Sequence, residues 1–250
     1  MGLVAIYYFY TSTSRDNPIT PEERKEPVRE IKIPLVEKNA SSYLHITGQR
    51  VHQKDWGTLT LLDYKPLNQT FKNSSMNMIV KDIKLIELSD MNKRTKELLR
   101  EYTGLSFQEV NEAFADENLS MQELDEKIAF SKIDIHDKIT YFQISYSVQN
   151  TADHDLQFFS MENVSFNKDL TFNVPNKNFI MSDDTMMGTR SVSRIDYRPN
   201  ETRKGMIGLI NDSEEMINQL TFFSFTTSDI LHGDSHKLLS KRKPFTVSLK

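Results

Sequence analysis

The chain contains no cysteine among its 250 residues. This absence excludes disulfide bonds, thiolate metal sites, cysteine nucleophiles and lipid attachment to cysteine. Glycine and proline are also scarce, with 8 of each, which argues against a fibrous or low-complexity chain. The net charge of -4 is small, whereas a nucleic-acid partner requires a concentrated basic surface. The remaining composition, 38% hydrophobic and 26% charged, is typical of a globular protein.

The motifs of the common catalytic families are missing as well. The sequence has no G-x-S-x-G nucleophile elbow and no H-E-x-x-H zinc motif. No two glycines have the spacing of a phosphate-binding loop. We therefore assign no catalytic residue and no cofactor, and we expect a protein that is not an enzyme.

The first residues form a short apolar run. Residues 2–10 (GLVAIYYFY) are followed by the small polar stretch 11–14 (TSTS). Nine residues are too few for a bilayer-spanning helix, which needs about 20, but they match the apolar region of a signal peptide. We interpret residues 1–14 as a membrane anchor or the remnant of a signal. The alternative is a buried N-terminal strand, because tyrosine and phenylalanine favour strands.

Residues 15–42 combine four prolines with many charged side chains. Proline interrupts helices, and a charged stretch has little apolar surface to bury, so this segment is predicted to be an extended spacer. An apolar start followed by a stiff spacer would hold a domain away from a membrane.

Two strands and then a helical segment are predicted after Tyr43. Residues 58–64 and 76–88 have the character of strands, whereas residues 91–127 have a helical pattern. Two capping boxes, Ser106-x-x-Glu109 and Ser120-x-x-Glu123, predict the starts of two short helices. We expect these helices to be an insertion packed against a sheet.

The rest of the chain is predicted to consist mainly of strands. In residues 141–149, apolar side chains alternate with Gln143, Ser145 and Ser147, which indicates one buried and one wet face. Upstream, Ile128 and Phe130 occupy even positions, whereas Ile133 and Ile135 occupy odd positions. This change in the alternation suggests a β-bulge near Lys132. Further strands are expected at 156–161, 191–197, 205–210, 220–225 and 245–249. The fold class is therefore mainly β: an immunoglobulin-like antiparallel β-sandwich over residues 43–250, with the helical insertion at 91–127.

Two segments resemble a known family. Residues 142–156 (FQISYSVQNTADHDL) contain Asn150, Thr151 and Asp153 in an N-T-x-D turn. Residues 199–210 (PNETRKGMIGLI) contain Pro199 and Gly205, a turn followed by an apolar strand. Together they resemble the telokin-like immunoglobulin domains of Gram-positive extracytoplasmic lipoproteins, a family of unknown function.

The resemblance implies a surface-displayed β-sandwich without catalysis. The chain departs from the family pattern at Asn200, where the family prefers glycine, and in lacking the lipid-modified cysteine. The residues themselves agree with the predicted turns. Asn150 and Asp153 can hydrogen-bond a turn backbone, and Gly205 permits a bend or a close approach.

One cluster has the residue types of a metal site. Asp229, His232, Asp234 and His236 lie within eight residues and could bind Zn²⁺ or another divalent ion. Gly233 breaks any helix that would place the two histidines on one face, so we favour a solvated loop and assign no metal ligand.

The main functional hypothesis is a non-enzymatic interaction module at the outer face of the cell envelope, membrane-associated through its N-terminus or secreted. Its partner would be a protein or an envelope polymer, and not a nucleic acid. One alternative is a structural subunit of an envelope assembly or a mobile-element system. The other is a metal-binding protein or metalloenzyme that uses the loop at 229–236.

Overall fold

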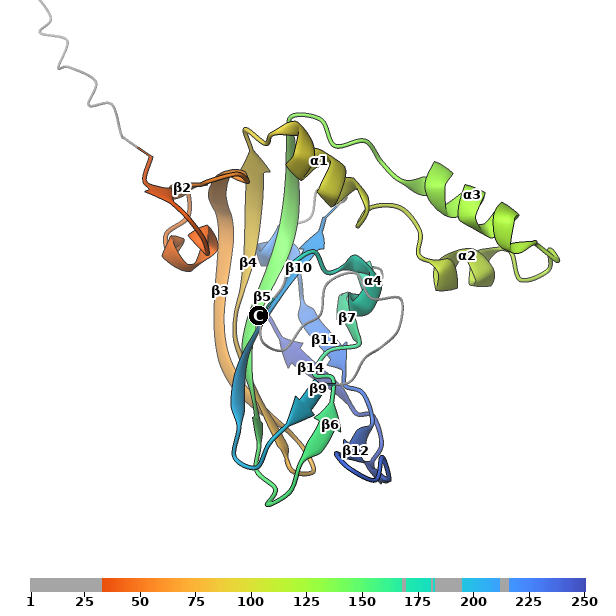
Figure 1. Ribbon diagram of the computed structural model, residues 1–250. Helices are drawn as coiled ribbons and strands as arrows, with labels where there is room; N and C mark the ends of the chain where they lie inside the picture. The colour runs from red at the N-terminus through yellow and green to blue at the C-terminus, as the bar shows by residue number, and fades with distance from the viewer. Residues whose placement is uncertain (1–32, 168–169, 181, 183–194, 212–215) are drawn as a thin grey trace, which may run out of the picture. The chain divides into compact units, whose positions relative to one another are not determined.

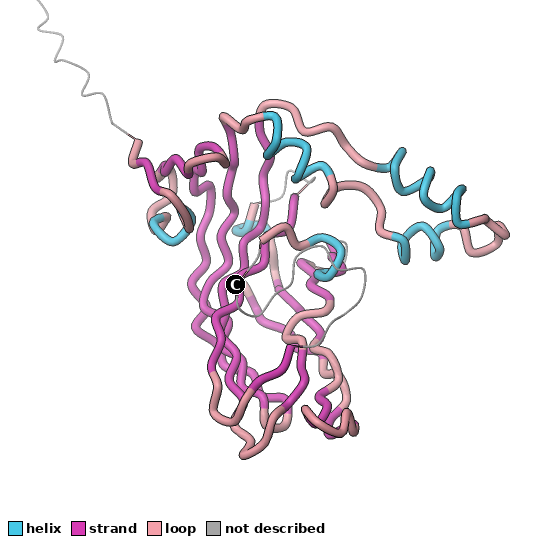
Figure 2. Tube along the Cα trace, viewed as in Figure 1, coloured by secondary structure: helices cyan, strands magenta, loops and turns pink. Residues whose placement is uncertain are grey.

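The computed structural model describes residues 33–167, 170–180, 182, 195–211 and 216–250. The predicted anchor, residues 1–14, and most of the predicted spacer lie outside these ranges. Strands are the most frequent regular elements among the described residues, and the helices are short (Figure 2). The prediction of an immunoglobulin-like antiparallel β-sandwich with a helical insertion is confirmed.

The largest sheet of the described residues has six strands in the order β1-β2-β3-β4-β5-β10. Neighbouring strands are antiparallel, except that β1 and β2 run parallel. The strands are β1 (Leu35–Val36), β2 (Arg50–Gln53), β3 (Gly57–Asn73), β4 (Met76–Ser89), β5 (Lys138–Asn150) and β10 (Thr202–Ile210).

Two four-stranded sheets lie against one face of the large sheet, which we call its inner face (Figure 1). One of them has the order β14-β11-β7-β8, and the other has the order β13-β12-β6-β9. Their strands are β6 (Leu156–Phe158), β7 (Asn163–Phe166), β8 (Leu170–Asn173), β9 (Ile195–Tyr197), β11 (Phe222–Thr226), β12 (Ile230–His232), β13 (Leu238–Ser240) and β14 (Pro244–Ser248).

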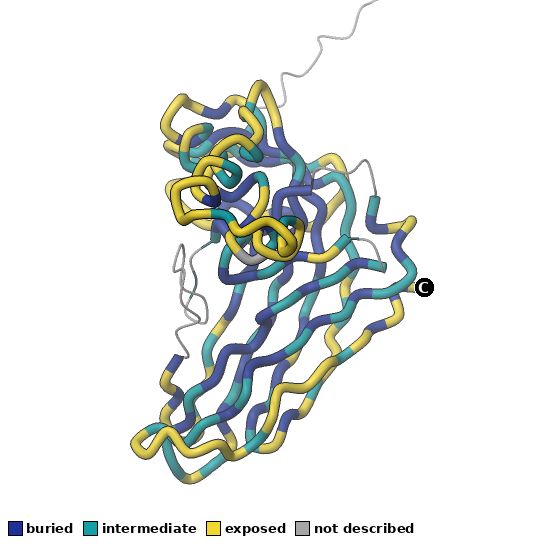
Figure 3. The backbone as a smooth tube through the Cα atoms, turned by 90° about the vertical axis from the view of Figure 1, so that its right-hand side faces the viewer, coloured by how far each residue is buried: buried dark blue, intermediate teal, exposed yellow. Residues whose placement is uncertain are grey.

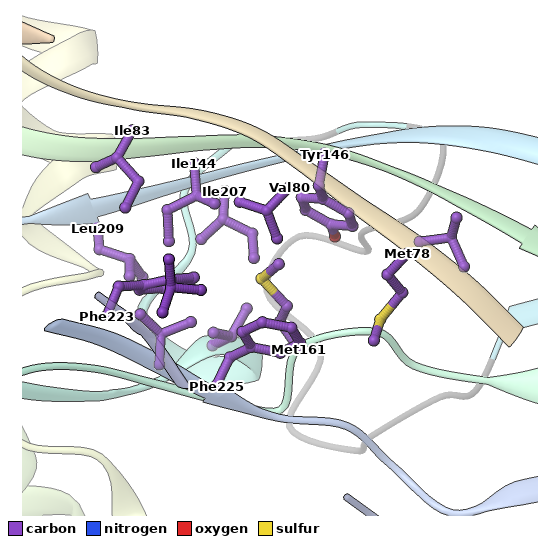
Figure 4. Close-up of a cluster of buried hydrophobic side chains, with 14 of the residues drawn as sticks. Met78, Val80, Ile83, Ile144, Tyr146, Met161, Ile207, Leu209, Phe223 and Phe225 are labelled. Atoms are coloured by element: carbon purple, nitrogen blue, oxygen red, sulfur yellow. The ribbon is translucent and has the colours of Figure 1, made fainter. Parts of the chain in front are cut away.

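The main hydrophobic core fills the space between these layers. Ile144 and Ile207 of the large sheet face Phe223 and Phe225 of β11, and all four side chains are buried (Figure 4). Burying one such side chain contributes roughly 1.5–3 kcal/mol. The alternation along β5 produces this arrangement, because every second side chain of a strand points to the same face.

A second hydrophobic cluster covers part of the opposite, outer face of the large sheet. It contains Ile139 and Tyr141, which alternate along β5 with the inner-face residues. The cover comes from the 3-10 helix η1 (Ala40–Tyr43), from helix α1 (Lys93–Arg100) and from Phe179, which follows the short helix α4 (Val174–Lys177). The large sheet is therefore buried on both faces in the region that this second cluster covers.

Residues 33–42 are part of the sandwich. Strand β1 pairs with β2, and Ala40 is fully buried in the outer-face cluster. The Lys84 amine donates to the backbone carbonyl of Ser41 over 2.9 Å, which fixes this segment on the sheet. The prediction that the spacer extends to residue 42 is therefore wrong for its last ten residues, because they pair and pack despite their charges.

Four of the predicted strands are longer in the structure, whereas those predicted at 156–161 and 220–225 are shorter, as β6 and β11. β4, β5 and β10 contain the predicted strands at 76–88, 141–149 and 205–210. β3 extends far beyond the predicted 58–64, since two register shifts in its pairing with β4 accommodate its irregular second half, which includes Pro66. Of the strand predicted at 191–197, the described part is β9.

Both predicted capping boxes are confirmed. They start helices α2 (Phe107–Ala113) and α3 (Met121–Ser131). The Ser106 hydroxyl accepts from the Glu109 backbone N–H over 3.2 Å, and the Glu109 carboxylate accepts from the Ser106 backbone N–H over 2.6 Å. Each box satisfies backbone donors that the first helical turn leaves without partners.

The α2–α3 hairpin extends away from the sheets (Figure 1) and is largely exposed (Figure 3). The two helices contact each other. Their buried residues Val110 and Leu124 belong to neither hydrophobic cluster. The prediction that the helical insertion packs against the sheet is correct for α1 and wrong for this hairpin.

The expected β-bulge near Lys132 is also wrong. Helix α3 runs to Ser131, and β5 begins only at Lys138. Leu124 and Ile128 continue the helical spacing that the second capping box starts, so the apparent phase change is the end of a helix. The Thr103 hydroxyl accepts from the Ile133 backbone N–H over 2.9 Å and closes the base of the hairpin.

We predict that the sandwich folds without the hairpin. Replacing residues 105–131 by a two-residue Gly-Ser linker should lower the melting temperature by no more than about 4 °C, which corresponds to roughly 1 kcal/mol for a domain of this size. Thermal unfolding followed by circular dichroism measures this change. In the full chain, Val110→Asp serves as the control and should leave the main transition in place. Loss of cooperative unfolding on deletion would show that the hairpin belongs to the core.

Candidate functional site

Asn150 lies at the end of β5 and connects three parts of the chain. Its side chain is fully buried, and its amide nitrogen donates to the carbonyls of His154, Tyr197 and Arg198 over 2.9, 3.1 and 3.1 Å. Its side-chain oxygen accepts from the Ala152 backbone N–H over 2.8 Å. The predicted hydrogen bonding of Asn150 to the turn is confirmed, and the network also reaches the segment that precedes Pro199.

Thr151 and Asp153 occupy the same turn. The Thr151 backbone N–H and hydroxyl both donate to the Ser75 carbonyl over 2.8 Å, which joins the turn to the β3–β4 connection. The Asp153 carboxylate is exposed and lies 2.8 Å from Nδ1 of His154, and this contact lowers the pKa of the Asp153 carboxyl. These residues stabilise a turn.

Pro199 and Asn200 form the predicted turn between β9 and β10. The Glu201 backbone N–H donates to the Arg198 carbonyl over 3.1 Å. Asn200 has a φ of 60°, in the left-handed region that asparagine tolerates better than most residues. The departure from the family's glycine at this position is therefore compatible with the same turn.

Gly205 is required by a close approach. It lies opposite Tyr146 in the pairing of β10 with β5, and a Cβ atom at this position would lie 2.0 Å from the Tyr146 ring. The two segments that carry the family resemblance therefore meet in the structure, once through Asn150 and once through Gly205.

The rings of the two histidines in the predicted metal cluster, His232 and His236, contact other groups of the protein. The His232 ring stacks on His154 with ring centroids 5.0 Å apart, and its Nδ1 accepts from the Asp234 backbone N–H over 3.3 Å. Nδ1 of His236 lies 2.8 Å from the side-chain oxygen of Gln157.

The carboxylate of Asp229 also has a hydrogen-bond partner, since it accepts from the Arg242 backbone N–H over 2.7 Å. Within the described ranges, no three His, Cys, Asp or Glu side chains come together as a metal site requires.

A cavity of about 450 Å³ opens on the outer face of the large sheet. Its apolar surface comes from strands β3, β4, β5 and β10 and from two segments beside the sheet. The apolar lining residues are Trp56, Leu59, Leu88, Tyr141, Phe179, Ile180 and Met206. The polar lining residues are Glu37, Lys38, Asn39, Ser41, Gln53, Lys54, Asp55 and Gln143. A mainly apolar cavity of this size suits a small ligand or a side group of a larger one.

The aromatic part of the cavity depends on Gly208. The ring centroid of Phe179 lies 6.1 Å from that of Trp56 and 5.0 Å from that of Tyr141. A Cβ atom on Gly208 would lie 2.6 Å from Ile180 and 2.9 Å from Phe179. Glycine at this position therefore allows both side chains to lie on the outer face.

Gln143 provides a polar group in this apolar lining. Its side chain was predicted on the wet face of β5, but the residue is only 1% exposed. This prediction is wrong, because η1 and Phe179 cover the outer face here. Among the described residues, the side-chain oxygen of Gln143 has no hydrogen-bond partner.

The charges of the cavity lie at its rim. Glu37 and Lys54 form an exposed ion pair with 3.2 Å between carboxylate oxygen and amine. Deeper in the cavity, burial raises the pKa of the Tyr141 hydroxyl far above its ordinary value, so this group stays protonated and neutral. Beside the cavity, burial lowers the pKa of the Lys84 amine, and the Asp82 carboxylate partly opposes this shift.

No sequence motif predicts this cavity. Trp56 is the single tryptophan of the chain, and large aromatic residues contribute strongly to cores and binding interfaces, so its position could have been considered. Gln143 and Phe179 lie 36 residues apart in the sequence, so no local pattern connects them.

No helix in the described part of the chain is both long and apolar enough to cross a membrane. No protein-family model matches the chain, and no curated protein matches it. A functionally unknown protein from Listeria monocytogenes EGD-e is similar in structure, with 10% identity over 77% of this chain and 87% of that chain and a TM-score of 0.42. A conserved hypothetical protein from Bacillus anthracis has 9% identity over 70% of this chain and 94% of that chain, with a TM-score of 0.32. Similarities this weak support no inference about function.

We predict that Asn150→Asp destabilises the protein in a pH-dependent way. The new carboxylate would face three carbonyl oxygens, which should cost about 3 kcal/mol or more at pH 7. The same environment raises its folded-state pKa above the unfolded value of about 3.9. The folded state then binds the proton more tightly, so the loss of stability shrinks as the pH falls through the folded pKa.

Urea unfolding at pH 7 and pH 5 measures this effect. Asn150→Ala is the matched control, because it removes the same hydrogen bonds without adding a charge and should lose the same free energy at both values. Equal losses for Asn150→Asp at the two pH values would contradict the assignment.

Proposed function

We propose that this protein is a non-enzymatic binding module displayed outside the cytoplasmic membrane, and that the outer-face cavity is its binding site. The bound group would be an apolar part of a protein or of a cell-envelope polymer. The observation that supports this proposal is the aromatic-lined cavity of about 450 Å³, whose lining includes a buried polar group with no hydrogen-bond partner among the described residues. The telokin-like identity of the domain is part of the same proposal.

The cavity walls are fixed by interactions within the protein. The Lys84 amine holds the Ser41 carbonyl over 2.9 Å on one side. On the other side, the Asn178 side chain accepts from the Gly208 backbone N–H over 2.8 Å and positions the segment that carries Phe179. Binding to a site that is already formed requires little further ordering of side chains and loops, so less conformational entropy is lost.

The chemistry of the lining supports binding over catalysis. The charged lining residues Glu37, Lys38, Lys54 and Asp55 are exposed at the rim. The buried polar groups are an amide, on Gln143, a hydroxyl, on Ser41, and a phenol whose pKa burial raises, on Tyr141. The Ser41 hydroxyl contacts the sulfur of Met206, which is not a general base. An amide is neither a general acid nor a general base, and such a phenol cannot exchange its proton readily near neutral pH.

The extracytoplasmic position is supported by the sequence. The apolar run at residues 2–10 and the proline-rich residues that follow it have the order of an anchor and a spacer. A protein held in this way would present its cavity to molecules of the envelope.

We predict that propylbenzene binds in the cavity. Saturable quenching of the Trp56 fluorescence measures the affinity, since the chain has no other tryptophan. At a free concentration 100 times the dissociation constant, the ligand should stabilise the fold by about 2.7 kcal/mol. Met206→Phe should fill the cavity and weaken binding, whereas Ile79→Phe, on an exposed position outside the cavity lining, should not. Unsaturable quenching, unchanged by Met206→Phe, would refute the cavity as a binding site.

We also predict that the protein fractionates with the cell envelope or the medium. Immunoblotting of cytosol, membrane and medium tests this, with a variant lacking residues 2–10 as the control that should move to the cytosol. Recovery of the unaltered protein in the cytosol alone would exclude display outside the membrane.

A further inference from the structure

Gln143 carries a buried hydrogen-bond acceptor that no described residue of the chain uses. The residue lies on β5, paired with Lys84 on one side and Gly208 on the other. It is 1% exposed, lines the cavity, and its side-chain oxygen has no partner within the described residues. A buried polar atom in this state costs free energy, and a donor from a ligand can recover that cost.

The neighbouring polar groups have other partners. The recorded hydrogen bond of the Lys84 amine goes to the Ser41 carbonyl, and the Ser41 hydroxyl lies 3.9 Å from the sulfur of Met206. The Gly208 backbone N–H donates to the side chain of Asn178. Among the described residues, these contacts leave the side-chain oxygen of Gln143 without a donor, so a ligand can supply one.

The apolar surroundings restrict what that group can be attached to. Trp56 and Phe179 are tilted by 32°, and Tyr141 meets Phe179 edge-on at 77°. Aromatic rings pack with one another in such tilted and edge-on arrangements. A flat apolar ring therefore suits the cavity, and the uncharged inner lining favours a neutral ligand, because burying a charge without a partner is costly.

We infer that the ligand of the cavity is an uncharged ring compound, or an uncharged ring on a larger molecule, that bears a hydroxyl or N–H group, and that this group donates to the side-chain oxygen of Gln143. This inference rests on the proposed function, because it requires the cavity to be a binding site. It adds a selection rule: ligands that lack the donor fit the same space but leave the acceptor of Gln143 without a partner.

The test compares two probes of nearly equal shape. 4-Propylphenol carries a donor, and 4-propylanisole replaces that donor by a methyl ether. Trp56 fluorescence and the ligand-induced shift in melting temperature measure both affinities. In the unaltered protein, 4-propylphenol should bind about tenfold more tightly, the factor that one neutral hydrogen bond supplies. Gln143→Leu should abolish this preference, and Gln149→Leu, on the same face of β5 but outside the cavity lining, should keep it.

The possible outcomes test the role of Gln143 and the proposed function separately. Tenfold preference that is lost in Gln143→Leu supports the inference. Equal affinity of the two probes for the unaltered protein overturns it, while the cavity remains a binding site. Failure of both probes and of propylbenzene to bind refutes the proposed function as well. If Gln143→Leu does not fold, Gln143→Met provides a flexible apolar replacement, and the comparison of the two probes on the unaltered protein decides by itself.

Discussion

The central constraint of this structure is that β4 and β5 are buried on both faces over part of their length, around Leu88 and Tyr141. Every second side chain of a strand points to the same side, so both sets of side chains must find cover. On the inner face, two complete sheets pack against residues such as Phe142 and Ile144. On the outer face, the cover comes from short segments, η1 and the residues around Phe179, which do not close over the whole sheet. The cavity lies where this outer cover is incomplete.

At the other end of β5, the layers are joined by polar contacts. Asn150 hydrogen-bonds the turn that leads to β6 and the turn that joins β9 to β10. Strands β6 and β9 belong to one of the four-stranded sheets, whereas β10 belongs to the large sheet. Gly205 fixes the same junction sterically, because its missing side chain makes room for Tyr146. The sandwich therefore has a polar junction at one end of β5 and an apolar cavity towards the other, so changes at one end need not disturb the other.

The sequence predicted those features that depend on short-range patterns. Capping boxes place both partners within three residues, and two of the four hydrogen bonds of the Asn150 side chain lie within its own turn, so these contacts could be predicted from adjacent residues. The bonds of Asn150 to the carbonyls of Tyr197 and Arg198 could not. Burial of Gln143 could not be predicted, because its cover comes from segments about 100 residues before it and 36 residues after it. For the same reason, residues 33–42 read as a charged spacer although they pair with β2. The position of the α2–α3 hairpin was missed because its buried apolar residues, Val110 and Leu124, belong to neither cluster on the sheet, and its other large apolar residues, such as Phe130, are exposed.

Strand β1 also has a mechanical consequence. It is the first described strand of the chain, and it pairs with β2 over two residues only. The residues directly after it, 37–41, form part of the cavity wall. Tension on the preceding part of the chain would therefore load β1 first, and a short parallel pair yields before the long ladders of β3, β4 and β5. Separation of β1 from β2 would displace residues 37–41 in the cavity wall. The affinity of the proposed binding site would therefore depend on the force along the chain.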